Sequence, residues 1–203
     1  FKERLIFSDS PPVFRISCLL IMRIKHFEIE GLIEFFPDIH KDDRGCFVET
    51  WQETRYQKLG ISSHFVQDNF SFSSYGTLRG LHFQKKYPQG KLITAIEGEV
   101  FDVAVDLRRS SPTFGRWQSV VLNGIDKNQL WIPPGFAHGF FVLSPKALVT
   151  YKCTDFYHPS DEGCIKWNDS DVGIDWPINI NPTLSPKDAC APSFRTFTSG
   201  LVS

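Results

Sequence analysis

The segment Leu92-Ile-Thr-Ala-Ile-Glu-Gly-Glu-Val-Phe-Asp-Val-Ala-Val-Asp-Leu107 has the most regular alternation of apolar and polar side chains in the sequence. From Phe101 onward every second residue is apolar, which is the period-two pattern of a half-buried β-strand. The pair Glu97-Gly98 is a turn signal. We therefore predict a β-hairpin whose arms are residues 92–96 and 101–107.

Short β-favouring runs and turn signals continue on both sides of this segment. We expect further strands at residues 130–132, 140–143 and 147–157, and short helices only near residues 53–59 and 186–189. Turn signals lie at Asp43-Arg44-Gly45, Tyr75-Gly76, Asn123-Gly124 and Pro133-Pro134-Gly135. Many short strands around a single core predict an all-β sandwich or barrel.

Composition limits the class of protein. The 203 residues suffice for one sizeable core and are few for two domains. Hydrophobic residues make up 41%, charged residues 22%, and the net charge is −1. We therefore expect a soluble protein that binds neither nucleic acid nor a membrane. The five cysteines include no C-x-x-C pair, which argues against a disulfide framework and favours a reducing, cytoplasmic location.

The two ends of the chain differ from its middle. Met22 is the only methionine, and the strand-like pattern begins directly after it. We expect residues 1–21 to be a non-native or disordered extension whose removal leaves stability and activity intact. The alternative is an ordered arm that packs on the domain. Residues 22–203 are expected to form a single domain, with the Pro- and Ser-rich segment after Trp176-Pro177 wrapped over its surface.

Two histidines stand in settings that suit chemistry. His82 follows Arg-Gly-Leu in a strand-like run, and His138 follows the rigid turn that begins at Pro133. A strand histidine by itself is more often a hydrogen-bonded core residue than a catalyst. Residues 133–138 match the P-x-G-x-x-H half of the metal-binding cupin pattern, but Gln84 replaces the second histidine of the other half, H-x-H. Glutamine is a poor metal ligand. We therefore predict no catalytic metal and a neutral histidine that acts as a general base.

Three cations stand beside glycines: Arg44, Arg79 and Lys91. They are either solvated charges at turns or ligands for a diphosphate, which guanidinium groups bind in bidentate fashion. Arg79 and His82 are three residues apart and would face opposite sides of a regular strand. If both line one pocket, Gly80 between them should mark a bulge. The sequence has no G-x-G-x-x-G, Walker or G-x-S-x-G motif, so nucleotide-redox, ATP and serine-hydrolase chemistry have no support.

Tyr151 and Tyr157 have the same parity in the run that begins at Ala147. On a regular strand they would face the same way, about 20 Å apart. They are either core aromatics or, in the sharper interpretation, a phenol at a reacting sugar and a ring stacked on a distant base.

Taken together, these segments resemble the dTDP-4-dehydrorhamnose 3,5-epimerase family. The resemblance runs in order from about Met22 to Pro192. It rests on the segments Asp43–Glu49, Phe65–Asn69, Leu78–Gln84, Gly90–Leu92, Gly98–Arg108, Ser111–Gly115, Gln129–Gly139, Tyr151–Asp155, Trp167–Asp169, Gly173–Pro177 and Leu184–Ala189. So many ordered motifs are more specific than any one of them.

The resemblance implies a cupin-like jelly-roll β-barrel and a homodimer that exchanges N-terminal strands. It implies a substrate, dTDP-4-dehydro-6-deoxyglucose, on the route to dTDP-rhamnose for cell-surface polysaccharide, and no cofactor. It places His82 as the base, Tyr151 as the acid and Asp188 as the carboxylate paired with His82. The substrate-binding positions that it implies are Arg44, Glu49, Gln67, Asp68, Asn69, Arg79, Lys91, His138, Tyr157, Glu162 and Lys187.

The residue chemistry supports such a reaction independently. A proton at C3 or C5 of the sugar can be removed only because the C4 ketone takes the charge as an enolate. The reaction needs a base, a donor to the developing oxyanion and an acid on the opposite face. A histidine held by a carboxylate, a lysine such as Lys91 and a tyrosine can fill these roles.

Several alternatives stay open at this stage. A 3-only or 5-only epimerase, or a ketoisomerase on a related nucleotide sugar, would keep the same histidine and tyrosine. A non-catalytic cupin-like protein that binds sugars or acts in regulation would be expected to lose the base or its carboxylate, and both are present. A metal-dependent cupin oxygenase is opposed by Gln84.

Overall fold

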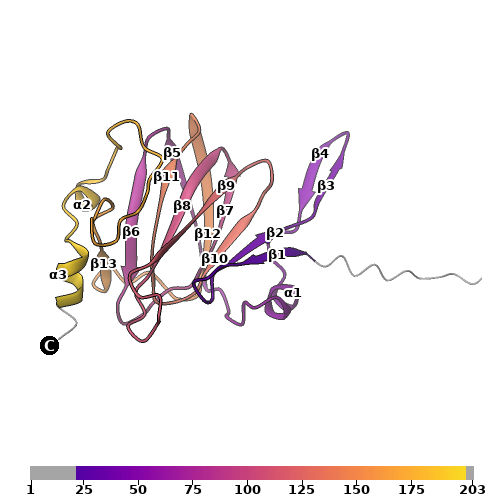
Figure 1. Cartoon of the computed structure of the whole chain (residues 1–203). Helices are drawn as coiled ribbons and strands as arrows, with labels where there is room; N and C mark the ends of the chain where they lie inside the picture. The colour runs from indigo at the N-terminus through magenta and orange to yellow at the C-terminus, as the bar shows by residue number, and fades with distance from the viewer. Residues whose placement is uncertain (1–21, 200–203) are drawn as a thin grey trace, which may run out of the picture.

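The computed structural model describes residues 22–199, which contain two large antiparallel sheets, a separate hairpin and short helices (Figure 1). One sheet has the strand order β1 (Arg23–His26), β2 (Ile33–Phe36), β10 (Gln129–Ile132), β7 (Lys91–Glu97), β12 (Lys146–Cys153) and β5 (Gln67–Ser74). The other has the order β13 (Glu162–Cys164), β6 (Leu78–Gln84), β11 (Phe136–Val142), β8 (Glu99–Asp106) and β9 (Trp117–Asn123). The hairpin is β3 (Ile39–Asp42) with β4 (Gly45–Val48), and the helices are α1 (Glu53–Lys58), α2 (Pro186–Ala189) and α3 (Phe194–Ser199).

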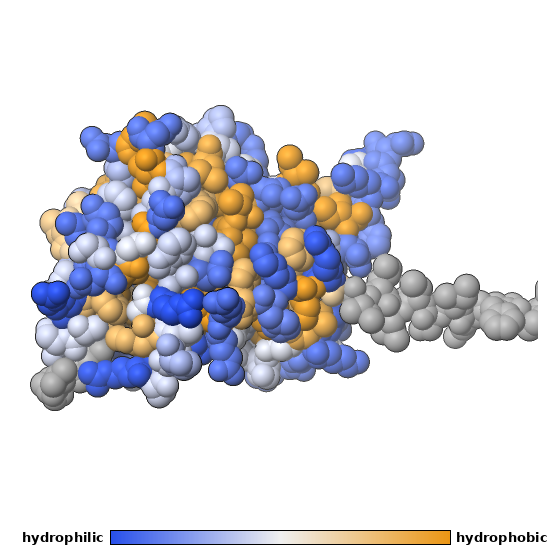
Figure 2. All heavy atoms as spheres, in the orientation of Figure 1, coloured by the Kyte–Doolittle hydropathy of each residue, from blue (hydrophilic) through white to orange (hydrophobic). Residues whose placement is uncertain are grey.

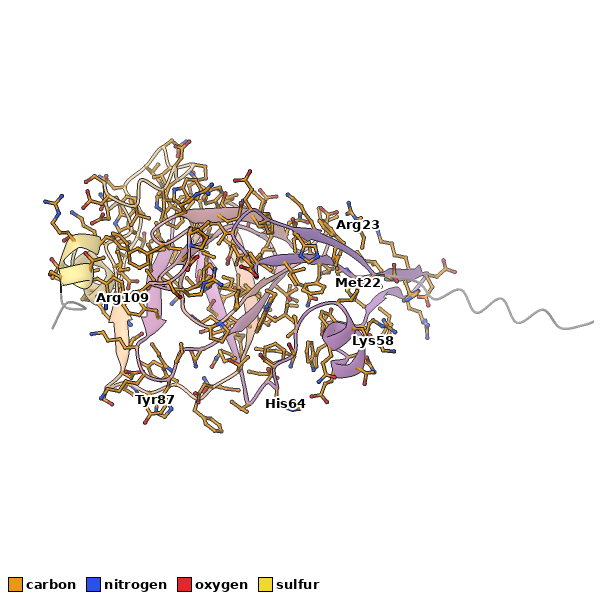
Figure 3. The ribbon with its side chains drawn as sticks, turned by 60° about the horizontal axis from the view of Figure 1, so that its bottom comes forward. Met22, Arg23, Lys58, His64, Tyr87 and Arg109 are labelled. Atoms are coloured by element: carbon orange, nitrogen blue, oxygen red, sulfur yellow. The ribbon has the colours of Figure 1, made fainter. Side chains whose placement is uncertain are left out.

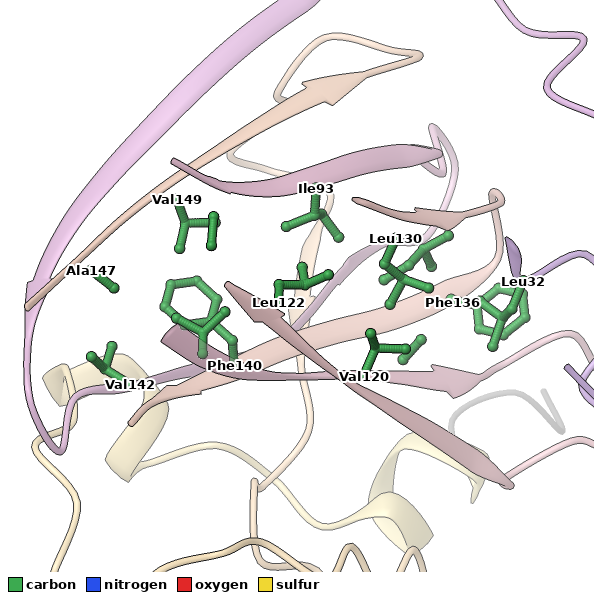
Figure 4. Packing of buried hydrophobic residues seen from close by; sticks show 14 of the residues in the cluster. Leu32, Ile93, Val120, Leu122, Leu130, Phe136, Phe140, Val142, Ala147 and Val149 are labelled. Atoms are coloured by element: carbon green, nitrogen blue, oxygen red, sulfur yellow. The ribbon is translucent and has the colours of Figure 1, made fainter. Parts of the chain in front are cut away.

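The two large sheets face each other across a core of aliphatic and aromatic side chains (Figure 4). Ile93 and Val149 enter it from the six-stranded sheet, while Leu122, Phe136 and Phe140 enter it from the five-stranded sheet. All five are at most 4% exposed. Burial of such a layer is the main term that stabilises a two-sheet barrel. The predicted all-β class is confirmed.

The hairpin predicted at Glu97-Gly98 is not formed. β7 pairs with β10 and β12 in one sheet, whereas β8 pairs with β9 and β11 in the other. Gly98 is therefore the corner at which the chain crosses between the sheets. Its φ is +78°, and a Cβ atom there would lie 2.0 Å from the carbonyl oxygen of Lys146, so only glycine fits.

The predicted alternation of apolar and polar side chains is present along β8, but both faces of the strand are buried. Val103 and Val105 face away from the barrel interior and pack beneath the C-terminal segment, which contributes Trp176 and Ile165. The wholly buried carboxylate of Asp102 lies on the opposite face, toward the other sheet. The apolar stripe therefore marks the layer covered by the C-terminal segment, and the polar positions face the barrel interior.

The C-terminal segment lies along the outside of the five-stranded sheet (Figure 1). Helix α2 matches the predicted residues 186–189. Helix α3 was not predicted, and it packs Phe197 against Phe83 with 5.0 Å between the ring centroids. Trp176 donates its indole N–H to the carbonyl of Trp167 at 2.8 Å. These contacts cover the apolar outer face of β6 and β8.

Helix α1 covers part of the outer face of the six-stranded sheet. Tyr56 is fully buried against Phe35, and Met22 joins the same cluster at 3% exposure. Figure 3 marks Met22 close to β1 and Lys58 on the helix. The predictions for residues 1–21 lie outside the described residues. Between residues 22 and 199, no helix combines the length and the apolar character that a membrane span requires.

The β3–β4 hairpin extends away from both large sheets (Figure 1). In Figure 2 it projects at the upper right as a mainly hydrophilic arm. Most of its side chains are exposed, including Phe47 at 70%. A hydrophobic side chain on an arm that touches little of its own domain suits contact with another molecule.

Candidate active site

A histidine–carboxylate pair lies at one end of the barrel. His82 Nε2 on β6 is 2.6 Å from Asp188 Oδ1 on α2. Asp188 is 2% exposed, and its backbone N–H donates to Ser185 Oγ, which caps the short helix. Burial alone would raise the pKa of Asp188, but hydrogen bonds from His82 and the Gly80 N–H, together with the charge of His82, lower it. Asp188 is therefore ionised and holds the imidazole in one orientation.

The predicted bulge at Gly80 is present in the pairing of β6 with β11. His82 lies opposite His138 and Arg79 opposite Phe140, so three steps on β6 match two on β11. Gly80 has a φ of +125°, and a Cβ atom there would lie 2.5 Å from Gly139 Cα. The extra residue turns Arg79 and His82 to the same side of the strand, while Leu78 and Leu81 both reach the core on the other side.

Tyr151 on β12 forms the opposite wall of the pocket, with Lys91 on β7 beside it. Tyr151 is paired with Ile93, two residues along β7 from Lys91, so both side chains face the same way. Burial raises the pKa of the Tyr151 phenol, assisted by Cys153 and opposed by Arg79. Burial lowers the pKa of the Lys91 ammonium, and the negative charge of Asp102 partly opposes that shift. The phenol stays protonated, and the ammonium is a stronger acid than a solvated lysine.

A second histidine–carboxylate pair lies deeper in the barrel. His138 Nε2 is 2.8 Å from Asp102 Oδ2, and both residues are buried. Burial lowers the pKa of His138, and the positive charge of Lys91 lowers it further, as does that of His82 when His82 is protonated. Asp102 acts in the opposite direction and raises this pKa. His138 is therefore held neutral below the pocket floor. Asp102 was not singled out from the sequence, and the available signal was a carboxylate within an otherwise apolar strand.

The pocket between these walls has a volume of about 300 Å³. It is lined by Gln67, Asn69, His82, Phe83, Gln84, Gln89, Lys91, Tyr151, Tyr157 and Glu162. Gln84 and Gln89 place part of its wall beside the β6–β7 connection, whose Tyr87 is labelled at the lower edge of Figure 3. A cleft with a few convergent polar groups is the usual form of a small-molecule site.

Tyr157 lies in this pocket for a different reason from the one expected. β12 ends at Cys153, so Tyr157 is on the following loop and not on a continuous strand with Tyr151. Its N–H donates to Gln67 Oε1 at 2.9 Å and its hydroxyl to Glu162 Oε2 at 3.0 Å. Lys187 Nζ donates to Glu162 Oε1 at 2.6 Å. The predicted separation of about 20 Å, which assumed a regular strand, therefore does not apply.

Both ends of the Gln84 side-chain amide are hydrogen-bonded to the backbone of loops beside the pocket. Its amide nitrogen donates to the carbonyls of Tyr87 and Phe156, and its oxygen accepts from the His158 N–H. The metal-binding arrangement of cupins would need an imidazole at this position. The absence of a catalytic metal stays a prediction, with Gln84 as its support.

The geometry suits proton transfer beside a carbonyl group. A held imidazole, a protonated phenol on the facing wall and a partly buried ammonium converge on one cavity. Groups of these three kinds can act as the base, the acid and the oxyanion donor that an enolate mechanism needs.

A family pattern described as dTDP-4-dehydrorhamnose 3,5-epimerase matches residues 26–196 of the chain. The chain belongs to this family. A relative of that name from Pseudomonas aeruginosa is 50% identical over 174 residues, which are 85% of this chain and 96% of that protein. The solved 3,5-epimerase of Legionella pneumophila, in complex with dTDP-4-keto-L-rhamnose, is 51% identical with a TM-score of 0.86. The two chains align over 89% of this chain and 96% of the Legionella chain.

A solved structure with another stereochemical outcome is also similar. A 3'-monoepimerase from Streptomyces bikiniensis, in complex with dTDP-quinovose, is 33% identical with a TM-score of 0.81. The two chains align over 86% of this chain and 90% of the Streptomyces chain. The likeness to these epimerases confirms the predicted cupin-like fold.

Six binding positions that the family resemblance implies do not line this pocket. Arg79, His138 and Lys187 are neighbours of residues that do line it. The other three lie farther away. Arg44 is on the β3–β4 hairpin with its side chain 90% exposed and paired with Asp42. Glu49 is paired with Arg55 at 2.8 Å near α1. Asp68 lies on the opposite face of β5 from the pocket residue Asn69. Within one chain, the structure brings together the sugar-sized end of the site and leaves these three apart.

Proposed function

We propose that this chain is a dTDP-4-dehydrorhamnose 3,5-epimerase, which converts dTDP-4-dehydro-6-deoxy-D-glucose to dTDP-4-dehydro-L-rhamnose. The observation that carries the proposal is His82, bonded to a buried carboxylate, facing Tyr151 across a pocket that also holds Lys91. The family pattern and the 50% identity to the Pseudomonas aeruginosa epimerase support it. The reaction would serve dTDP-rhamnose biosynthesis for cell-surface polysaccharide, in the cytoplasm.

In the proposed mechanism His82 removes the proton next to the ketone. Its Nε2 atom contacts Asp188, so Nδ1 is the ring atom available to the sugar. The imidazolium formed by abstraction is stabilised by the ionised Asp188, which acts as a positioning residue. Asp188 is 2% exposed, so this attraction is weakly screened by water.

Lys91 stabilises the enolate oxygen. A partly buried ammonium with a lowered pKa donates more strongly to a developing oxyanion than a hydrated lysine does. Tyr151 then returns a proton on the face opposite His82. Its raised pKa keeps the phenol protonated at neutral pH, which is the state an acid requires.

The nucleotide would extend along the loop that carries Tyr157. The Tyr157 ring is 49% exposed, and its hydroxyl is fixed by Glu162, so its face is available for stacking on a base. Gln67 and Asn69 are joined by a hydrogen bond of 3.0 Å and offer polar atoms along the same wall. Arg79, whose Nε donates to Ser73 Oγ at 3.0 Å, is the cation that we assign to the diphosphate.

We further propose that the active form is a homodimer with exchanged N-terminal strands. The β3–β4 hairpin carries Arg44 away from its own pocket, so a second copy can receive it. The outer face of β5 exposes Phe70 at 74% and Phe72 at 57%. Phe70 also lines a cavity of about 370 Å³ whose walls include Leu92. An apolar face of this kind suits an interface between subunits.

Proton exchange in deuterated water tests the function. The unmodified protein, given dTDP-4-dehydro-6-deoxyglucose, should place deuterium at C3 and at C5 and form the rhamnose configuration. His82→Ala should abolish both exchange and inversion. Tyr151→Phe should retain exchange, because the enolate still forms, and lose inversion by roughly 10²–10⁴-fold.

Matched surface variants control the experiment. His64→Ala and Tyr75→Phe alter exposed residues outside the pocket and should behave as the unmodified protein. Loss of exchange together with inversion in Tyr151→Phe would make Tyr151 a binding residue instead of the acid. An unmodified protein that binds the nucleotide sugar without any exchange would be a binding protein, and the enzyme proposal would be wrong.

A 3-only epimerase is the second candidate, favoured by the similarity to the Streptomyces bikiniensis 3'-monoepimerase. The same experiment separates the two, because such an enzyme would produce inversion at C3 alone. The higher identity to 3,5-epimerases, 51% against 33%, favours inversion at both carbons.

A further inference from the structure

A third potential metal ligand adjoins the His82–Asp188 pair. Cys164 on β13 lies directly opposite His82 on β6, so their side chains emerge on the same side of the sheet. Cys164 Sγ is 3.9 Å from Asp188 Oδ1, and His82 Nε2 is 2.6 Å from the same oxygen. One donor atom from each of the three residues lies within 4.8 Å of the others. Across residues 22–199 this is the one such group of three.

The donor set of nitrogen, sulfur and oxygen suits one class of ion. Thiolate and imidazole ligands select zinc and similar borderline-soft ions over magnesium or calcium. Three protein ligands with an open fourth position are common around zinc, at about 2.0–2.3 Å from the ion. Tetrahedral bonds of that length separate the ligand atoms by roughly 3.3–3.8 Å. The Cys164–Asp188 distance of 3.9 Å is close to this range, whereas the His82–Asp188 contact of 2.6 Å would have to open.

We propose that His82, Cys164 and Asp188 form an inhibitory site for zinc, in which the metal replaces the proton between the base and its carboxylate. This proposal rests on the proposed function, because it assigns regulation to the same dyad. The ion would bond to Nε2, and the proton now on Nε2 would move to Nδ1. The Cys164 thiol proton would leave to solvent, and water would fill the fourth position. A ring protonated at Nδ1 cannot accept a proton from the sugar.

The ion can approach the site from two sides. His82, whose side chain is 27% exposed, opens to the substrate pocket. Cys164 lines a separate cavity of about 380 Å³ beneath α3, where Glu162 also contributes to the wall. Zinc and the nucleotide sugar would therefore compete for His82 without sharing the whole of either cavity.

Cobalt(II) absorption tests the site without turnover. The full chain, freed of metal, should bind one cobalt ion with the absorption of a thiolate-to-cobalt bond. Cys164→Ser should lose that absorption, while Cys190→Ser, which removes an exposed thiol, should retain it. An unmodified protein that shows no thiolate–cobalt absorption, or the same absorption in Cys164→Ser, would overturn the proposal. If Cys164→Ser does not fold, Cys164→Ala takes its place.

Zinc inhibition of deuterium exchange tests the consequence. Each protein is compared with its own metal-free rate, in buffers of fixed free zinc. The concentration for half inhibition should rise at least about tenfold in Cys164→Ser, since loss of a ligand costs no less than loss of an outer partner. Equal inhibition of both proteins would also overturn the proposal. Failure of the proposed function would differ in kind, because the metal-free protein would show no exchange while the cobalt signal remained.

Discussion

At the scale of single residues, two histidine–carboxylate pairs on neighbouring strands differ in their access to solvent. His82 opens to the pocket, whereas His138 is 7% exposed and bonded to the fully buried Asp102. The second carboxylate oxygen of Asp102 has no hydrogen-bond partner among residues 22–199. A buried anion in this position is costly unless a cation compensates it. Lys91, whose pKa Asp102 raises, is the cation that we assign to this role.

Replacement of Asp102 by Asn should shift the pH dependence of turnover. The Asp102 charge raises the pKa of Lys91 against the larger lowering by burial, so its loss should lower that pKa further. In the proposed mechanism Lys91 donates only when protonated, so activity should be lost as the pH rises through the pKa of Lys91. The basic limb of kcat/KM against pH should therefore move to lower pH in Asp102→Asn. The exposed Asp126→Asn serves as the control. An unmoved basic limb would show that another group titrates there.

At the scale of elements, the bulge in β6 changes which residues of the strand share a face, and it lies between Arg79 and His82. Gly80 contacts the backbone of β11 so closely that an added Cβ would lie 2.8 Å from the His138 carbonyl oxygen. The adjacent strand therefore requires glycine for space as well as for its positive φ.

Gly80→Ala should destabilise the fold and disturb the dyad. A side chain at this φ costs about 1–3 kcal/mol, and the backbone contact adds to it. Gly173→Ala is the matched control, because its φ is +63° but its nearest neighbour would be 3.7 Å away. Urea unfolding should give a larger loss of stability for Gly80→Ala, accompanied by loss of exchange activity. Similar losses of stability in the two variants would mean that β11 adapts to the added methyl group.

The loop after β8 is organised by one buried carboxylate. Asp106 accepts hydrogen bonds from the side chains of Arg108, Ser111 and Thr113. Burial alone would raise the pKa of Asp106, but these bonds lower it to about 2. These bonds tie the loop from Arg108 to Thr113 to the end of β8.

The free energy of unfolding should fall in acid because the Asp106 carboxylate becomes protonated. Its folded pKa is below the unfolded value of 3.8, so the stabilisation is complete above about pH 4 and is lost as the pH falls toward 2. The difference corresponds to about 2 kcal/mol. Thermal unfolding measured between pH 2 and pH 5 should show a shallower decline in Asp106→Asn than in the unmodified protein. An equal slope in both proteins would place the acid sensitivity elsewhere.

At the scale of the whole molecule, the position of Arg44 suits the proposed dimer, in which one subunit would complete the site of the other. The hairpin that carries it belongs to neither large sheet, and its side chain is paired only with Asp42 among the described residues. A diphosphate in the His82 pocket would lack this cation unless a second copy supplied it.

Mixing two inactive variants tests this arrangement. His82→Ala and Arg44→Ala should each be impaired, but a heterodimer has one pocket with both residues intact. After unfolding and refolding together in equal amounts, about a quarter of all pockets should be complete. The mixture should recover about that fraction of the unmodified activity, and His82→Ala refolded alone provides the control. An Arg44→Ala variant of normal activity, or a mixture without recovery, would exclude the shared site.

The amino-acid sequence by itself determined the β class and the short helices near residues 53–59 and 186–189. Both depend on local properties: the period-two alternation of apolar side chains and the scarcity of helical patterns. The bulge at Gly80 was expected on the further condition that Arg79 and His82 line one pocket, and glycine has the conformational freedom that a bulge requires. The family resemblance identified His82, Asp188 and Tyr151 as a group, and the structure brings His82 to Asp188 and into the pocket with Tyr151.

Only the tertiary structure decided which strands are neighbours and which face of each strand is inside. β7 and β8 are adjacent in sequence but lie in different sheets, because the pairing of strands depends on distant segments that pack against them. The same packing put the polar face of β8 inside, with Asp102 beneath the pocket, and brought Cys164 beside Asp188. Alternation of side chains within a strand is a local property of the sequence. Burial of one face of that strand, however, depends on which distant segments pack against it.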